Sequence, residues 1–214
     1  MYRVHHRFHV FCLTLLGAAS AGATGVAVQV QDAAGNALPD TVIYIEAEAG
    51  PAGAKAPANA EIEQKNLKFM PLVTVVQTGG KVFFPNNDRV RHHIYSFSAA
   101  HKFDQKLYSG QSAAPQVFDK AGTVVLGCNI HDKMLAYVKV VDTPYFAKTD
   151  GAGAARIELP AGGRYVVKAW HYNTAGGATP EQVLTVKAGD ALSTAVFKLP
   201  MKPPVAVDTT SSAY

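Results

Sequence analysis

The chain of 214 residues carries 20 lysine and arginine residues against 16 aspartate and glutamate residues, a formal net charge of +4. An excess this small, with no strongly basic patch, gives no reason to expect nucleic acid as a partner. The length is sufficient for one large domain or two small ones.

Residues 1–23 have the pattern of a secretory signal peptide. Two arginines precede an apolar run at 10–16, and the small residues at 19–21 form an A-x-A cleavage site. The chain contains no second apolar stretch of about 18 residues, so we expect no integral membrane segment after signal cleavage. The expected location of the protein is the periplasm.

The rest of the chain has the composition of β-strands rather than helices. Short segments rich in β-branched and aromatic residues recur at roughly ten-residue intervals, bounded by Gly, Pro, Asn and Asp clusters. This spacing predicts an all-β sandwich or barrel, with a linker rich in Ala, Gly and Pro at 50–60. The predicted strands lie at 26–30, 41–45, 73–76, 81–84, 123–126, 137–141, 155–159, 165–170, 183–186 and 195–199.

A short loop after the predicted strand 123–126 is rich in metal ligands. Cys128, His131 and Met134 place a thiolate, an imidazole and a thioether at three-residue intervals. A type 1 copper site uses two His nitrogens and one Cys sulfur in a trigonal plane with a weak axial Met, so three of its four ligands are present. The other cysteine, Cys12, lies in the signal peptide, which leaves Cys128 without a disulfide partner in an oxidising compartment. The missing ligand is expected to be an upstream His.

Residues 60–142 resemble the cupredoxin family of blue copper proteins, especially plastocyanin and amicyanin. The resemblance rests on the segment 75–87, on the His pair at 92–93 and on the short Cys-x2-His-x2-Met loop. It implies a Greek-key β-sandwich that holds one type 1 copper ion cycling between Cu(I) and Cu(II). The copper ligands that it implies are His92, Cys128, His131 and Met134.

The first His ligand has an alternative. Cupredoxins carry Asn after this His, whereas the present chain carries His93 after His92. Neighbouring residues of a regular strand point to opposite faces, so the two imidazoles cannot both face the metal. The register of the resemblance favours His92, and His93 remains the alternative.

Other residues near the loop have expected roles. Asn129 is predicted to direct its backbone N–H or its side chain toward the thiolate or the His92 loop. Asp132 and Lys133 lie beside His131, the expected solvent-facing ligand, where they either set the charge at the electron exit or form an ordinary solvated pair. Further away, His101 is expected at the surface, and His171 at a sandwich edge beside a packed Trp.

The two flanking segments resemble a different module. Residues 28–43 are similar to the opening hairpin of carboxypeptidase regulatory-like, or transthyretin-like, β-sandwiches, and residues 148–167 are similar to its later hairpins. This order predicts a second small β-sandwich into which the cupredoxin domain is inserted. The predicted division is a signal peptide at 1–23, the second sandwich at 24–50 and 143–200, the cupredoxin domain at 60–142 and a disordered tail at 201–214.

The resemblance, which extends to proteins labelled as methylamine-utilisation proteins, implies a small periplasmic electron carrier. Its partners would be periplasmic redox proteins such as a cytochrome or a dehydrogenase. The alternative is a copper-binding protein for storage, delivery or sensing, whose site would release copper readily. We do not expect an enzyme, because copper oxidases and nitrite reductases need a second copper site, and the five histidines beyond the signal peptide are scattered.

Overall fold

The computed structural model describes residues 24–48, 57–110, 114–160, 162–187 and 192–203. The predicted signal peptide, much of the predicted linker and most of the predicted tail lie outside the described residues. The described chain is all-β, as predicted, and includes one short 3-10 helix, η1 (Ala175–Gly177). In this part of the chain, no helix has the length and the apolar run needed to span a bilayer.

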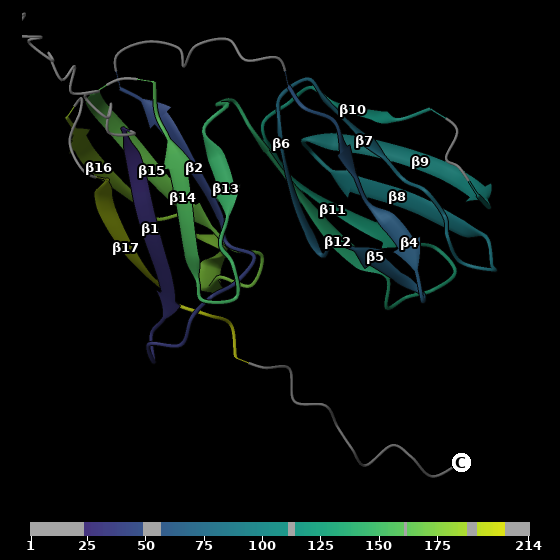
Figure 1. The fold of residues 1–214 in the computed structure, drawn as a ribbon. Coiled ribbons are helices and arrows are strands. Elements are labelled where there is room, and N and C mark those ends of the chain that lie inside the picture. The colour runs from purple at the N-terminus through teal and green to yellow at the C-terminus, as the bar shows by residue number, and fades with distance from the viewer. Residues whose placement is uncertain (1–23, 49–56, 111–113, 161, 188–191, 204–214) are drawn as a thin grey trace, which may run out of the picture.

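Strands from the middle of the chain form one β-sandwich (Figure 1). A five-stranded sheet with the order β6-β12-β11-β8-β9 faces a three-stranded sheet with the order β10-β7-β3, and a small hairpin, β4-β5, lies beside them. The bounds are β3 (Ala60–Glu61), β4 (Glu63–Lys65), β5 (Lys68–Met70), β6 (Val73–Gln77), β7 (Gly80–Phe83), β8 (His92–Ser98), β9 (His101–Tyr108), β10 (Gln116–Phe118), β11 (Gly122–Cys128) and β12 (Leu135–Val141).

The core of this sandwich follows from the two-residue period of its strands. On β11, Val124, Leu126 and Cys128 are buried, while the residues between them face the other side of the sheet. Phe84 and Phe118 close the core from the facing sheet. The alternation therefore determines which side chains at the strand ends point inward.

Strands from both ends of the chain form a second pair of sheets. One has the order β14-β1-β17, in which β1 pairs in parallel with β17, and the other has the order β13-β2-β15-β16. Each of these sheets thus combines strands that lie before residue 60 and after residue 142, and the division into domains stays a prediction. The bounds are β1 (Gly25–Asp32), β2 (Val42–Ala47), β13 (Phe146–Lys148), β14 (Ala154–Glu158), β15 (Gly163–Trp170), β16 (Glu181–Val186) and β17 (Ser193–Leu199).

All ten predicted strands are present, with bounds within two residues of those expected. The described residues contain seven further strands that were not predicted: β3, β4, β5, β8, β9, β10 and β13. Met201, at the start of the predicted tail, forms a β-bridge with Thr174, so backbone pairing continues past residue 200.

A third hydrophobic cluster joins the two sandwiches. It forms where the outer face of β6 and β12 meets β2 and β15. Lys148 adds a polar link, because its ammonium group donates both to the Asp40 carboxylate (2.7 Å) and to the carbonyl of Val73 (2.8 Å). The buried members of this interface cluster are Val42, Tyr44, Val73, Val141 and Trp170.

Lys139 is a buried cation within this interface. Its ammonium nitrogen lies 5.6 Å from the ring centre of Tyr44 and 5.5 Å from that of Trp170. Burial, together with the positive charge of Lys168, lowers the pKa of Lys139 below its usual value. The folded protein therefore disfavours the charged form of Lys139, and the ring contacts offset part of this cost.

We expect Lys139→Met to raise the free energy of unfolding by on the order of 1 kcal/mol at neutral pH, because an apolar chain of similar length replaces a desolvated charge. The gain should shrink as the pH rises from the folded-state pKa toward the ordinary value of 10.5, since the unfolded chain then binds more protons than the folded one. Urea unfolding of both proteins across this pH range measures the difference. An equally large gain at high pH would contradict the prediction.

Candidate metal centre

The site lies where β8 begins and β11 ends. His92 is the first residue of β8, Cys128 is the last residue of β11, and Cys128 pairs with Ile94 across the two strands. Both side chains occupy inward-facing positions, so His92 is 0% exposed and Cys128 is 3% exposed. Antiparallel pairing thus brings together two residues that are 36 positions apart in the sequence.

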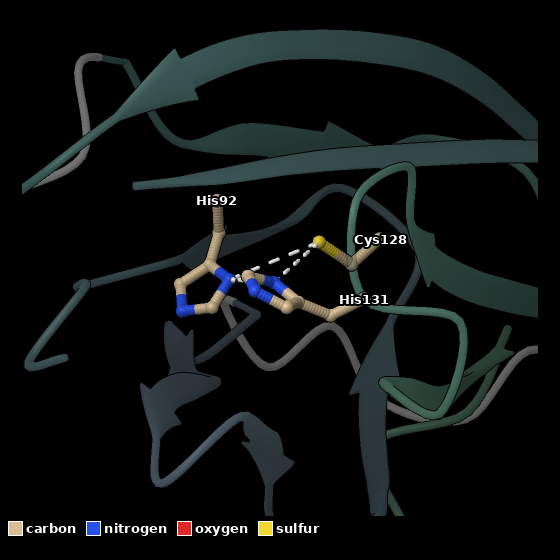
Figure 2. A group of neighbouring side chains, drawn as sticks. All are labelled: His92, Cys128 and His131. Carbon is tan, nitrogen blue, oxygen red and sulfur yellow. Dashed lines mark hydrogen bonds between the residues drawn. The ribbon is translucent and has the colours of Figure 1, made fainter. Parts of the chain in front are cut away.

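His131 completes a triangle of ligand atoms (Figure 2). The Nδ1 atoms of His92 and His131 are 3.1 Å apart. The Sγ atom of Cys128 lies 3.8 Å from the first nitrogen and 3.7 Å from the second. Within the described residues, this is the one group of three or more His, Cys, Asp or Glu side chains close enough together to hold a metal ion.

The triangle fits one metal ion. First-row metal ions bind His nitrogen at about 2.0 Å and Cys sulfur at about 2.3 Å, which places trigonal ligand atoms roughly 3 to 4 Å apart. The three distances in this site lie within that range. A trigonal set of two imidazoles and one thiolate is characteristic of type 1 copper.

Met134 is buried beside the triangle. It is 2% exposed and belongs to the same hydrophobic cluster as Cys128. The backbone N–H of Met134 donates to the carbonyl of His131 (2.9 Å), which closes a turn between these two residues. The short loop thus returns the Met134 side chain to the core that also contains Cys128, and its thioether would be available there as a weak fourth ligand.

His93 points away from the triangle. It is partly exposed on the outer face of β8, where its Nε2 atom pairs with the carboxylate of Asp104. The alternation of the strand therefore brings His92, and not His93, to Cys128 and His131. This is the placement that the register of the resemblance favoured.

Hydrogen bonds join the two loops that carry the ligands. The backbone N–H of Asn129 donates to the carbonyl of His93 (3.1 Å), one of the contacts expected of this residue. Asn86 organises the loop before β8, because its side-chain amide donates to the carbonyls of Val90 and Tyr108, both at 2.9 Å. These contacts hold both loops in position independently of a metal ion.

Asp88 is a functional candidate that the sequence analysis missed. Its Oδ2 atom accepts from Nε2 of His92 (2.8 Å) and from the backbone N–H of Leu67 (3.0 Å). Its Oδ1 atom accepts from the backbone N–H of Asn66 (2.6 Å). Partial burial alone would raise the pKa of Asp88, but the hydrogen bonds from these three residues outweigh it and lower the pKa. Asp88 therefore places the proton of His92 on Nε2 and leaves Nδ1 free to bind a metal.

Asp88→Ala is expected to weaken copper binding by about 10-fold to 100-fold, because ligand His residues lose orientation when their carboxylate partner is removed. Competition titration with a chelator of known affinity measures the change. Asp132→Ala is the matched control, since Asp132 is an exposed acid next to His131 in the chain. Equal affinities for the two variants would show that Asp88 does not orient His92.

A second polar group lies beneath the site. The phenol of Tyr108 donates to the carbonyl of Phe84 and also contacts the buried amide of Gln64. Desolvation raises the pKa of Tyr108 to about 12, the hydrogen bond from Gln64 opposes this, and the charge of Cys128 adds a smaller increase. Tyr108 therefore stays neutral and adds no charge beside the thiolate.

The remaining predicted residues lie outside the triangle. His101 is half-buried against Phe118, with ring centres 4.5 Å apart, rather than solvated at the surface as expected. His171 is buried and stacks on Tyr172, next to the buried Trp170. Asp132 and Lys133 are exposed beside the partly exposed His131. None of these four joins the ligand cluster.

The fold and the site together define an all-β protein with a candidate type 1 copper centre built from two His, one Cys and one Met. No family model matches the sequence. No curated protein matches it either.

Several solved structures are similar to part of the chain. A purple cupredoxin from Nitrosopumilus maritimus is 22% identical, with a TM-score of 0.34 over 38% of this chain and 99% of its own. Amicyanin from Paracoccus versutus is 18% identical, with a TM-score of 0.36 over 46% of this chain and 98% of its own. A copper-containing nitrite reductase from Thermus scotoductus is 22% identical, with a TM-score of 0.37 over 45% of this chain. The chain spans about a quarter of the length of that reductase.

Each likeness covers less than half of the chain at low identity.

Proposed function

We propose that the protein is a periplasmic blue copper protein of the cupredoxin type, which carries single electrons between redox partners. The observation that carries the proposal is the buried triangle formed by Nδ1 of His92, Nδ1 of His131 and Sγ of Cys128. Copper bound in this triangle would supply exchange of one electron between Cu(I) and Cu(II).

The protein residues have distinct tasks in this proposal. Cys128 supplies the soft thiolate, the two imidazoles suit both oxidation states, and Met134 supplies the weak axial sulfur. Hydrogen bonds at Asp88 and Asn129 hold the ligand loops in place. The geometry should therefore change little between oxidation states, which favours fast electron exchange.

The exposure of the ligands favours electron transfer over copper delivery. His92, Cys128 and Met134 are almost fully buried, and only the edge of His131 reaches solvent. A delivery protein must surrender its metal to an incoming ligand, and buried ligands oppose such exchange. Electrons, in contrast, can leave through the partly exposed imidazole of His131.

The remaining assignments belong to the same proposal. The signal-like segment at 1–23 supports export to the periplasm, where a cytochrome or dehydrogenase would exchange electrons with the protein. Residues 60–142 would form the cupredoxin domain, inserted in a carboxypeptidase regulatory-like sandwich formed by 24–50 and 143–200. The sheets that combine strands from both ends of the chain support this division. We propose no enzymatic activity.

The test is a spectroscopic titration of the mature protein with Cu(II). We expect one equivalent of copper, an intense visible absorption from the thiolate-to-copper transition, and small copper hyperfine splitting in the EPR spectrum. Ascorbate should bleach the absorption and air or ferricyanide should restore it over repeated cycles. A pale spectrum of ordinary type 2 copper, or copper that does not cycle, would refute the electron-carrier function.

A further inference from the structure

The outer face of the five-stranded sheet carries an exposed apolar patch. Phe97 on β8 is 81% exposed, and its ring centre lies 5.1 Å from that of Tyr95 on the same strand. Val125 on β11 and Leu135 on β12 extend the patch and are also exposed. Two shallow hollows lie on either side of the Tyr95 and Phe97 rings. We call these four residues the Phe97 face.

The Phe97 face continues an interface that the protein already uses. Leu135 and Tyr137 lie on the same side of β12, two residues apart. Tyr137 packs in the interface cluster, whereas Leu135 remains exposed. Within the described residues, the second sandwich thus covers the outer face at β6 and at the Tyr137 part of β12, and it leaves β11, β8 and β9 open (Figure 1). Large exposed apolar side chains that adjoin a packed interface indicate a binding surface.

The Phe97 face is connected to the candidate metal centre through Gly127. This residue precedes the ligand Cys128 and pairs with Tyr95 across the two strands. A Cβ atom added at Gly127 would lie 2.8 Å from the ring and the hydroxyl of Tyr95, so the ring lies directly on the glycine backbone. The surface is thus separated from the thiolate by one aromatic ring and one peptide unit.

Two lysines and one acidic residue, Asp104, line the β9 side of the face, which gives that side a small excess of positive charge. Lys102 lies directly across from Phe97 on the edge strand β9, and Lys106 follows on the same side of that strand. Within the described residues, neither lysine forms an ion pair, whereas the carboxylate of Asp104 is paired with His93. An apolar centre with free cations at its border complements a partner with an apolar centre and an acidic rim.

We infer that an acidic redox protein docks on the Phe97 face and exchanges electrons with the metal centre through Tyr95, Gly127 and Cys128. The inference rests on the proposed function and adds a second exchange surface, distinct from the edge of His131. With copper held by His92, Cys128 and His131, one electron would pass from the reduced partner to Cu(II), leaving the partner oxidised by one electron and the copper as Cu(I). Two surfaces allow a donor and an acceptor to bind without competing.

The first test measures binding on the copper-free protein, so it does not depend on the proposed function. The probe is oxidised cytochrome b5, a small acidic haem protein, added at low ionic strength to isotope-labelled protein. We expect NMR shift changes on β8, β9 and β11, and binding about tenfold weaker for Phe97→Ser. Lys102→Glu should also weaken binding, and added salt should reduce it.

Two matched variants give the comparison. Val196→Ser removes another apolar residue, 54% exposed on β17, and it should bind like the wild type. Leu67→Ser changes the exposed turn beside His131 and should also leave binding unchanged. Shift changes confined to the His131 end, an affinity of Phe97→Ser equal to that of the wild type, or self-association through this face would overturn the inference.

The second test measures the electron route on the copper-loaded protein by stopped-flow. Reduction by cytochrome b5 should be about tenfold slower for Phe97→Ser, while reduction by ascorbate stays at the wild-type rate. An unchanged rate with cytochrome b5 would overturn the route. If the wild-type protein shows no type 1 spectrum, the proposed function fails at that point, independently of the binding result.

Discussion

Cys128→Ala should abolish the intense visible absorption of the copper-loaded protein, because this absorption arises from the bond between copper and the thiolate. The remaining imidazoles of His92 and His131 should bind Cu(II) more weakly, with the spectrum of a type 2 site. The copper-free variant should lose only about 1 kcal/mol of stability, since the substitution removes a single buried atom. Absorption and EPR spectra before and after addition of copper measure the first effect, and urea unfolding measures the second.

The two adjacent histidines provide a matched pair for this experiment. His92→Ala should lose the absorption, because His92 faces Cys128 and His131. His93→Ala should keep it, because His93 lies on the outer face of β8 and pairs with Asp104. An intense absorption that survives in Cys128→Ala, or that disappears only in His93→Ala, would require a different ligand set.

Trp170→Ala should destabilise the protein by about 3 to 5 kcal/mol, the usual cost of truncating a large buried aromatic side chain. Trp170 ends β15 and fills the interface cluster, where its ring centre lies 6.3 Å from that of Tyr137. The loss should uncouple the two sandwiches, because the substitution removes the largest side chain of the cluster that lies between their two cores. Thermal unfolding should then show two transitions, only one of which bleaches the copper absorption.

Two comparisons make the interface experiment decisive. Far-UV circular dichroism reports on all strands, whereas the copper absorption reports on one sandwich. The midpoint temperatures of unfolding measured by these two signals should coincide in the wild type and differ in Trp170→Ala. Val196→Ala, at an exposed position on β17, should change neither midpoint. A single transition for Trp170→Ala, with a loss of less than about 1 kcal/mol, would show that the sandwiches are coupled elsewhere.

Two physical features account for six of the seven strands that the sequence analysis missed. β9 contains Lys102, Asp104 and Lys106 on its outer side, which dilutes the apolar pattern that marks a strand. Charged side chains are common on edge strands, where they prevent association with other sheets, and β9 is an edge of its sheet. β3, β4, β5, β10 and β13 are only two or three residues long, too short for a two-residue period to be recognised.

Two neighbouring aromatic residues near the start of β13 divide between the interface and a core. Phe146 packs against the interface cluster, whereas Tyr145 packs against the core of the second pair of sheets. Neighbouring residues of an extended chain point to opposite sides, so one side chain serves the interface and the other serves the core.

The sequence by itself determined the features that depend on local spacing. Cys128, His131 and Met134 lie within seven residues, so a single loop brings their side chains together whatever the rest of the fold. The longer strands were predicted for the same reason, because each carries its own run of β-branched and aromatic residues.

The tertiary structure decided the features that depend on pairing between distant segments. It placed His92 rather than His93 beside Cys128, since the pleat of β8 and its pairing with β11 determine which imidazole faces inward. It also brought Asp88 to His92 and left Phe97 on an open sheet face. Residue composition does not specify these contacts, because each depends on the register between strands that lie far apart in the sequence.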